Sequence, residues 1–435
     1  MNRRQLLWTA GGAGLALFGL GVPGLALGRD TADSPEAIAR DAWIYGLPLI
    51  EMATTRARHL KGGARINRFN GGRALATHEN RNVTTPNNDT LYLSAWLDLS
   101  KGPVTLTIPA LGERYWSVAV MDMFTNNNIV LGTRTVGGEG GVFTLIGPRQ
   151  EMVGDNPIRI ATPTAWVLAR VLVDGPDEVP TVQALLKGFK LSGPEISEAP
   201  PVYATRDADP KAYFDSVSEL MSLNWPPYTD LKLIRRASGL LGIDGGGADS
   251  AATLAGVEAA RKLVRGGWGR EPSVDGWTYP RASLGDFGQD YVYRAAIALG
   301  GLAALPRAEA TYLRIQGEKD GLLTGDGLYR LSLPAQVPVK GFWSLSMYEA
   351  TPDGQFFFTA NPLNRYAIGD RTKGLKRRAD GGVDIWVGRS DPGGERTSNW
   401  LPAPATGPFT VSWRAYLPDE PLLNGTWRLP PLQKV

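Results

Sequence analysis

A strand-like segment that occurs twice, 227 residues apart, constrains the fold of this chain most strongly. The first copy spans residues 115–122 and reads YWSVAVMD, and the second spans 342–349 and reads FWSLSMYE. Both keep the order aromatic, Trp, Ser, apolar, small, apolar, variable residue, carboxylate, and both are rich in residues that favour strands. Because side chains alternate across a strand, Asp122 and Glu349 each share a face with apolar residues of their own strand. Each strand should therefore carry an apolar face that ends in an acid.

The similarity between the two copies extends to their neighbours along the chain. Three further pairs of segments match in the same order: 104–109 with 329–334, 89–93 with 309–313, and 167–170 with 411–414. The matched order predicts two β domains of one design, arising by duplication. Between 82 and 173, short alternating runs predict strands at 90–99, 103–108, 115–122, 129–136, 142–146, 158–161 and 165–173, a spacing typical of a sandwich or jelly roll.

The ends and the middle of the chain have a helical pattern instead. Ser34-Pro35-Glu36 is a good helix start, although Gly46 and Pro48 are expected to break or kink that helix. Helices are also expected at 210–223, 229–241, 249–265 and 286–305. The predicted fold class is mainly β with α: two jelly-roll or β-sandwich domains joined by a helical segment. The expected parts are a leader at 1–28, the first domain with its helix at 29–195, a helical region at 196–305, and the second domain at 306–435.

The first 28 residues resemble a twin-arginine export signal. Arg3 and Arg4 precede a Gly-rich, mildly apolar run, and Ala26-Leu27-Gly28 offers small residues at the cleavage spacing. An uncleaved membrane anchor is the alternative, but five glycines between residues 11 and 21, together with Pro23, argue against it. We expect the twin-arginine translocase as a transient partner, cleavage near Gly28, a periplasmic location and no stable membrane insertion.

Charge and residue usage exclude several classes of function. Without the leader, 44 basic residues balance 43 acidic ones, so no electrostatic case for nucleic acid or an anionic membrane remains. The chain has no cysteine, which excludes disulfides, zinc–thiolate sites and cysteine nucleophiles. With only two histidines, a metal would have to be held mainly by oxygen. No cofactor is expected, and a calcium-like cation stays open.

Asp122 and Glu349 are the sharpest catalytic candidates. If the two β domains pack about a twofold axis, the two acids could lie across one cleft, as the paired carboxylates of a glycoside hydrolase do. The alternative is that each acid caps the loop that follows its own strand.

Taken together, the polar and aromatic segments resemble those of proteins that carry the DUF1254 and DUF1214 domains. The residues that carry the resemblance lie at 88–92, 114–126, 342–348, 361–366 and 399–402. The resemblance covers nearly the whole chain after the leader. It implies an exported bacterial protein with two β-rich domains, the second similar to nucleoplasmin and viral-coat jelly rolls, and it implies no particular activity.

Ligand-binding candidates come from these same segments. They are polar or aromatic residues near strand ends: Asn88, Asp89, Tyr92, Tyr115, Asn126, Trp343, Tyr348, Asn361, Arg365, Tyr366 and Trp400. Each group has an ordinary alternative: the asparagines can form turns, Arg365 can tie one loop to another, and the tryptophans can seal a core.

Two classes of function therefore stay open. The first is an exported protein that binds a polar or sugar-like small molecule between the two β domains, with hydrolase or lyase activity if the paired carboxylates act on it. The second is a non-catalytic structural protein of the periplasm that forms homo-oligomers.

Overall fold

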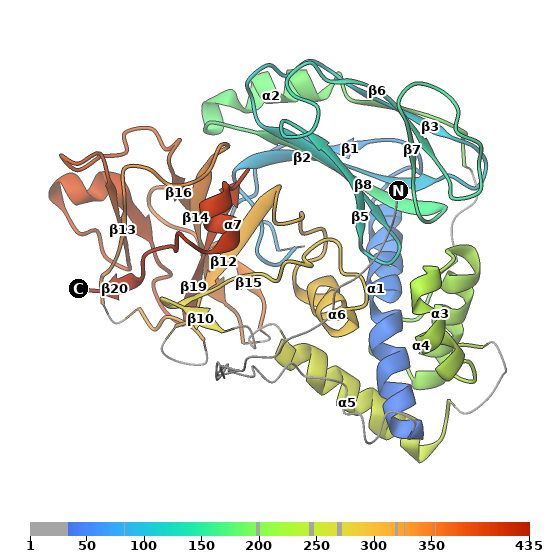
Figure 1. Cartoon of the computed structure of the whole chain (residues 1–435). Helices are drawn as coiled ribbons and strands as arrows, with labels where there is room; N and C mark the ends of the chain where they lie inside the picture. Colours follow the sequence, from blue (N-terminus) through green and yellow to red (C-terminus); the bar gives the residue numbers. More distant parts are fainter. Residues whose placement is uncertain are drawn as a thin grey trace, which may run out of the picture.

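The structure, a computed structural model, describes residues 34–81, 83–196, 201–242, 248–267, 272–317, 321–325, 327–352 and 354–435. The leader expected at 1–28 lies outside the described residues. Two β regions lie next to one another, and most of the helices gather along one side of them (Figure 1). Among the described helices, none combines the length and the apolar character that crossing a bilayer requires.

The long helix α1 (Pro35–Lys61) begins as expected but is not interrupted. The Ser34 side chain accepts a hydrogen bond from the backbone N–H of Ala37 and caps the helix. The break expected at Gly46 and Pro48 does not occur. A Cβ at position 46 would lie 2.5 Å from a Val217 methyl group, so the glycine permits close helix packing rather than ending the helix. Burial among other helices offsets the hydrogen bond that Pro48 cannot donate.

The first β region is a sandwich of two sheets. One sheet has the order β1-β2-β8-β4-β5, and the other has the order β7-β6-β3-β9. The strands are β1 (Asn70–Gly71), β2 (Thr90–Asp98), β3 (Val104–Ile108), β4 (Trp116–Asp122), β5 (Asn127–Gly132), β6 (Gly141–Ile146), β7 (Pro157–Arg159), β8 (Thr164–Leu172) and β9 (Lys190–Ser192). Apolar side chains from both sheets form one buried core between them.

The second β region is built in the same way. Its sheets have the orders β10-β11-β12-β19-β14-β15, with β16 also paired to β14, and β18-β17-β13-β20. The strands are β10 (Ser273–Val274), β11 (Trp277–Thr278), β12 (Ala310–Ile315), β13 (Tyr329–Leu333), β14 (Trp343–Ala350), β15 (Phe356–Phe357), β16 (Ala367–Gly369), β17 (Val383–Gly388), β18 (Trp400–Pro402), β19 (Phe409–Tyr416) and β20 (Leu432–Lys434). The hairpin β10–β11 lies in the segment expected to be helical, because Asp275 and Gly276 both adopt positive φ and form a tight turn.

The pairing of the strands confirms that the two sandwiches share one topology, as the matched segments predicted. The order β2-β8-β4-β5 in the first sandwich matches β12-β19-β14-β16 in the second, and the order β7-β6-β3-β9 matches β18-β17-β13-β20. The register is also the same: Ser117 lies opposite Arg170, and Ser344 lies opposite Arg414. Even the parallel pairs β6–β7 and β17–β18 correspond.

Most helices pack beside the two sandwiches, whereas α2 (Val179–Leu186) and α7 (Glu420–Asn424) each pack onto the core of one sandwich. Besides these and α1, the helices are α3 (Pro210–Leu223), α4 (Leu231–Arg236), α5 (Ala251–Gly267) and α6 (Tyr291–Gly300), with 3₁₀ turns η1 (Pro176–Glu178), η2 (Tyr228–Asp230) and η3 (Gly394–Asn399). Helix α1 packs against α3, α4, α5 and α6 around a shared apolar core. The helices expected at 229–241 and 286–305 are shorter than their apolar stripes indicated.

The two sandwiches meet through the outer faces of β4 and β14. Trp116 and Trp343 point into their own sandwich cores, so the alternate residues of each strand, beginning with Ser117 and Ser344, face outward. On that outer side Tyr115, Phe342 and Tyr416 form an aromatic cluster, with Phe342 and Tyr416 stacked at 4.1 Å between ring centroids. The interface therefore uses the face opposite to the one that carries Asp122 and Glu349.

Candidate functional site

Asp122, the first catalytic candidate, is buried at the end of β4 and bonded to its own loop. The carboxylate accepts hydrogen bonds from the backbone N–H groups of Phe124 and Asn126 and from the side-chain amides of Asn126 and Asn128. Burial raises the pKa of the Asp122 carboxyl, while the hydrogen bonds from the two asparagines oppose that shift. These contacts favour the loop-capping alternative for Asp122.

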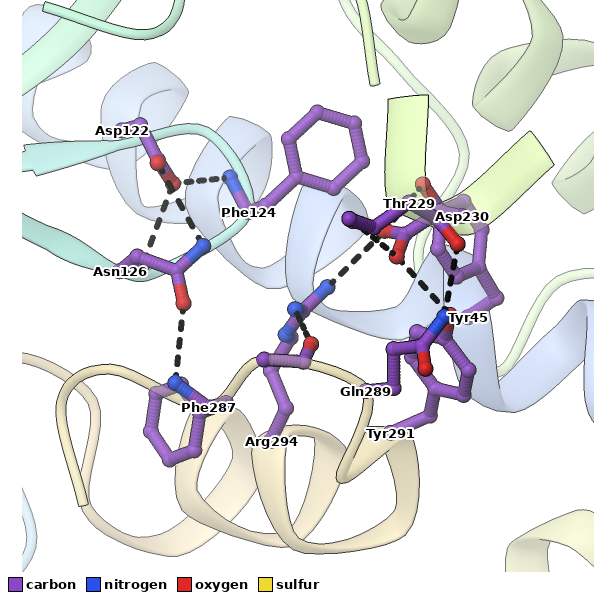
Figure 2. A network of polar contacts seen from close by, with 11 residues as sticks. Tyr45, Asp122, Phe124, Asn126, Thr229, Asp230, Phe287, Gln289, Tyr291 and Arg294 are labelled. Atoms are coloured by element: carbon purple, nitrogen blue, oxygen red, sulfur yellow. Dashed lines mark hydrogen bonds and ion pairs between the residues drawn. The ribbon is translucent and has the colours of Figure 1, made fainter. Parts of the chain in front are cut away.

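The loop that Asp122 holds is also the attachment point for α6 (Figure 2). The Asn126 side-chain oxygen accepts a hydrogen bond from the backbone N–H of Phe287, just before the helix. Asn127 continues the attachment, because its amide donates to the carbonyl oxygen of Ala304. Asn126, a ligand candidate from sequence, therefore joins a β loop to a helix.

Arg294 lies between this loop and a second buried acid, Asp230, as Figure 2 shows. The hydroxyls of Tyr45 and Tyr291 donate to the two carboxylate oxygens of Asp230, at 3.1 and 2.8 Å. The Arg294 guanidinium reaches Asp230 at 3.8 Å and donates to the carbonyl oxygen of Gly288. This network joins α1, η2 and α6, and its acids are occupied by hydrogen bonds inside the protein.

Glu349, the second catalytic candidate, lies at the surface end of β14. Its carboxylate pairs with Arg81 at 2.5 Å, and 26% of its side chain is exposed. No hydrogen bond or ion pair among the described residues joins Glu349 to Asp122, so the structure does not bring the two acids together through any direct contact.

The polar cluster of the second sandwich is occupied by structural contacts. Asn361 bonds within its own loop, to the backbone of Thr359, Leu363 and Arg365. Arg365 donates to the carbonyl oxygens of Thr397, Ser398 and Trp400, which is the loop-to-loop role expected as the alternative.

Three aromatic candidates and one amide also make internal contacts. The Trp400 ring is buried and donates to the carbonyl oxygen of Gly388, and Trp343 is buried in the core of the second sandwich. The Tyr366 hydroxyl lies 2.7 Å from His78 Nδ1. Asn88 donates to the carbonyl oxygen of Ala76.

The remaining candidates converge on the interface between the sandwiches, where two equivalent rows of side chains occur. In the first, Tyr92, Arg170 and Ser117 are cross-strand neighbours on β2, β8 and β4. In the second, the residues are Tyr312, Arg414 and Ser344 on β12, β19 and β14. Each row therefore reads Tyr, Arg, Ser across three strands.

Beside these rows two acids, the half-buried Asp89 and the buried Glu309, bond to residues of the opposite half. Asp89 precedes β2 of the first half and accepts a hydrogen bond from Ser344 of the second half at 2.7 Å. Its counterpart Glu309 precedes β12 and accepts from the Tyr115 hydroxyl and from Arg134 of the first half, at 3.0 and 2.8 Å. Burial raises the pKa of both carboxyl groups, and nearby arginines oppose the shift.

Two arginines at the interface donate hydrogen bonds to backbone carbonyl groups of the opposite half or of the turn that leads into that half. Arg414 donates to the carbonyl oxygens of Thr85 and Pro86, and the Tyr348 hydroxyl donates to Pro86 as well. Arg170 donates to the carbonyl oxygen of Ala303, in the turn that leads to β12. Asp89, Tyr92, Tyr115 and Tyr348 are thus the sequence candidates that the structure brings together.

Sequence reasoning did not select Arg170, Arg414 or Glu309. The available signal was the position of each arginine inside an apolar strand, at matched places in both copies, because an arginine in such a strand needs partners to be buried. The matched acids Asp89 and Glu309 gave a second signal.

The described residues include no cluster of metal-ligand side chains, and two small cavities lie beside α1. Among the described residues, no group of three or more His, Asp or Glu side chains is placed to share a metal ion. Two cavities beside α1 each enclose about 10 Å³, room for about one water molecule.

The fold and its interface define a protein of two duplicated β sandwiches, joined by reciprocal acid and arginine contacts and covered by helices on one side. Sequence models of two families, both described as proteins of unknown function, match it: DUF1254 at residues 66–193 and DUF1214 at residues 309–420. The chain belongs to the DUF1254/DUF1214 domain-containing proteins.

Two crystal structures resemble this chain. The VPA0106 protein from Vibrio parahaemolyticus is 22% identical, aligns with 92% of this chain and 100% of its own, and has a TM-score of 0.71, which supports the two-domain fold. A protein from Burkholderia cenocepacia is 15% identical over 90% of this chain and 93% of its own, with a TM-score of 0.46, too low to bear on the fold. No curated protein sequence matches this chain.

Proposed function

We propose that this protein is exported to the periplasm and binds a small polar molecule at the interface between its two β sandwiches. The observation that carries the proposal is the pair of Tyr–Arg–Ser rows, with Glu309 buried and Asp89 half-buried beside them. Polar groups at this density are costly to bury, and fixed arginine and tyrosine donors suit the recognition of polar ligands. Tyr92 and Tyr312 keep part of their surface exposed, which offers contact with solvent at this interface.

Binding has more support here than hydrolysis by Asp122 and Glu349. Asp122 is saturated by donors of its own loop, and Glu349 is paired with Arg81. A hydrolase or lyase activity would instead draw on Asp89 or Glu309, whose raised pKa suits a proton donor. The alternative is a structural protein that forms oligomers. In that case the same polar contacts would only fix the orientation of one sandwich relative to the other.

The test is a thermal-unfolding screen of the full chain against acetate, benzoate, phosphate, glucose and glycerol, followed by calorimetry. Ligands that raise Tm on the wild type should lose affinity when Tyr92→Phe and Tyr312→Phe remove the two hydroxyls. Tyr228→Phe is the matched control, because that side chain is 83% exposed and lies far along the chain from both rows. If no compound shifts Tm, or if the interface variants bind as well as the control, the proposal is wrong.

A further inference from the structure

The duplication allows one half of the interface to serve as an internal reference for the other. Arg414, on β19 of the second half, has partners for both terminal nitrogens. Its Nη1 donates to Ser346 at 2.5 Å, and its Nη2 lies 2.5 Å from the Tyr348 hydroxyl, besides the two carbonyl oxygens of the opposite half. The positive charge of Arg414 also lies close enough to Asp89 to oppose the rise that burial causes in the pKa of its carboxyl group.

Arg170, the counterpart on β8, is much less satisfied although it is only 5% exposed. Its Nη2 donates to Ala303, but its Nη1 is buried and has no hydrogen-bond partner. The hydroxyl of Ser117, directly opposite Arg170 in the β4–β8 pair, also has no partner at hydrogen-bond geometry, although its nearness opposes the rise that burial causes in the pKa of Tyr115. In the second half the equivalent hydroxyl of Ser344 donates to Asp89.

Two substitutions between the copies explain the difference. Ser346 and Tyr348 of the second half correspond to Ala119 and Met121 of the first, as the shared register shows. Alanine and methionine offer no hydroxyl, so Arg170 lacks the two side-chain partners that Arg414 has. Buried guanidinium and hydroxyl groups are rarely left without partners, because each such group then loses its hydrogen bonds to water without gaining others.

The charged groups near Arg170 indicate whether a partner for its Nη1 would be neutral or negatively charged. Glu309 is the buried acid on this side, but Arg134 pairs with it at 2.8 Å and Tyr115 donates to its other oxygen. No ion pair within the described residues involves Arg170. The charge of Arg170 also opposes the rise that burial causes in the pKa of Glu309, and its guanidinium carbon lies 5.5 Å from the centre of the Tyr92 ring, so what Arg170 lacks is an acceptor for Nη1. A carboxylate supplies such an acceptor, and its planar oxygen pair matches the geometry of the guanidinium.

We infer that Arg170 and Ser117 form a carboxylate-binding site, and that the small polar ligand of this protein is a monocarboxylate. One ligand oxygen accepts from Arg170 Nη1 and the other from the Ser117 hydroxyl. The inference rests on the proposed function and assigns its chemical class. A dianion such as phosphate is disfavoured because Glu309 and Asp89 lie close to the rows.

The decisive variant is Ala119→Ser, which gives Arg170 the hydroxyl that Ser346 gives Arg414. Isothermal titration of the full chain with acetate and benzoate should show at least a fivefold loss of affinity relative to wild type, and the ligand-free Tm should rise. Ala119→Gly is the matched control: it changes the same position without a hydroxyl and should keep the wild-type affinity. Ser117→Ala should also weaken binding at least fivefold, without involving the arginine.

The outcomes separate this inference from the proposed function. If both Ala119→Ser and Ser117→Ala bind carboxylates as tightly as the wild type does, Arg170 and Ser117 do not form the carboxylate-binding site. Binding of glucose or glycerol but not of acetate or benzoate overturns the monocarboxylate class and leaves the interface site standing. Preference for phosphate has the same consequence. Failure of every compound overturns the inference and the proposed function together.

Discussion

At the residue scale, Asp122 is expected to matter for folding rather than for ligand binding. Asp122→Asn places an amide nitrogen where donors from Asn126 and Asn128 now point, so one or two hydrogen bonds are lost in a buried position. Roughly 1–3 kcal/mol of the free energy of unfolding should be lost. Chemical denaturation measures this loss.

Glu349, the acid at the equivalent position of the second copy, provides the comparison for the denaturation of Asp122→Asn. Glu349→Gln removes a partly exposed ion pair with Arg81 and should cost about 0–1 kcal/mol. Asp122→Asn should leave carboxylate affinity within twofold of wild type. Abolished binding with unchanged stability would return Asp122 to the ligand site.

Asp370 predicts a pH dependence of stability. Burial raises its pKa to about 6, above the ordinary 3.8 of an aspartate, while the backbone N–H of Trp343 opposes the shift. The folded protein therefore holds a proton that the unfolded chain releases between about pH 4 and 6, and this contribution to stability is present below pH 4 and is lost as pH rises through 6.

The variant Asp370→Thr copies Thr133, whose hydroxyl accepts the equivalent backbone bond from Trp116. It should remove this part of the pH dependence and raise stability at pH 7 by roughly 1–2 kcal/mol, because one pKa unit corresponds to about 1.4 kcal/mol and Asp370 is only half-buried. Unfolding of both proteins at pH 5 and pH 7 provides the measurement. A variant whose pH 5 to pH 7 difference equals that of wild type would contradict the assignment.

At the element scale, the two tyrosines on Asp230 determine how firmly α1 and α6 are joined. Tyr45 is 1% exposed, so Tyr45→Phe leaves a buried carboxylate oxygen short of a donor, at a cost of roughly 1–3 kcal/mol. Tyr291 is partly exposed, and water can replace its hydroxyl, so Tyr291→Phe should cost about half as much.

The double variant tests whether Asp230 couples the two helices. Because both hydroxyls donate to one carboxylate, the two losses should differ from simple addition by at least 0.5 kcal/mol. Additive losses, or a larger loss for Tyr291→Phe than for Tyr45→Phe, would mean that Asp230 does not link α1 to α6.

At the scale of the whole molecule, export is predicted from the leader. Arg3→Lys together with Arg4→Lys should keep the precursor in the cytoplasm, whereas the wild type should yield mature protein starting near Arg29. Fractionation and N-terminal sequencing make the comparison, with Lys61→Arg as a control outside the leader. Mature periplasmic protein from the doubly substituted chain would contradict the prediction.

The reciprocal contacts of the interface bear on stability at the same scale. Arg134 of the first half reaches Glu309 of the second, and its counterpart Arg371 reaches Asp174 of the first. Each half therefore supplies a basic residue to the other, which explains how two similar sandwiches form a fixed pair rather than two loosely linked domains.

Local sequence patterns were enough to predict most of the strands and their repetition. Alternating apolar residues located β2, β4 and β8, and the matched order of segments predicted the second sandwich, because strand patterns depend on neighbours along the chain. The helix start at Ser34 followed in the same way from local hydrogen bonding. The break expected at Pro48 was wrong because packing, which is not local, holds α1 together.

The contacts of the acidic side chains depend on how distant segments pack, and the sequence patterns did not predict them. Asp122 and Asp89 look alike in sequence, yet one bonds to its own loop and the other to Ser344, 255 residues away. The interface uses the outer faces of β4 and β14, and this choice depends on how the sheets pack. The contrast between Arg170 and Arg414 likewise exists only where two halves meet, since partners for a buried charge come from distant segments of the chain.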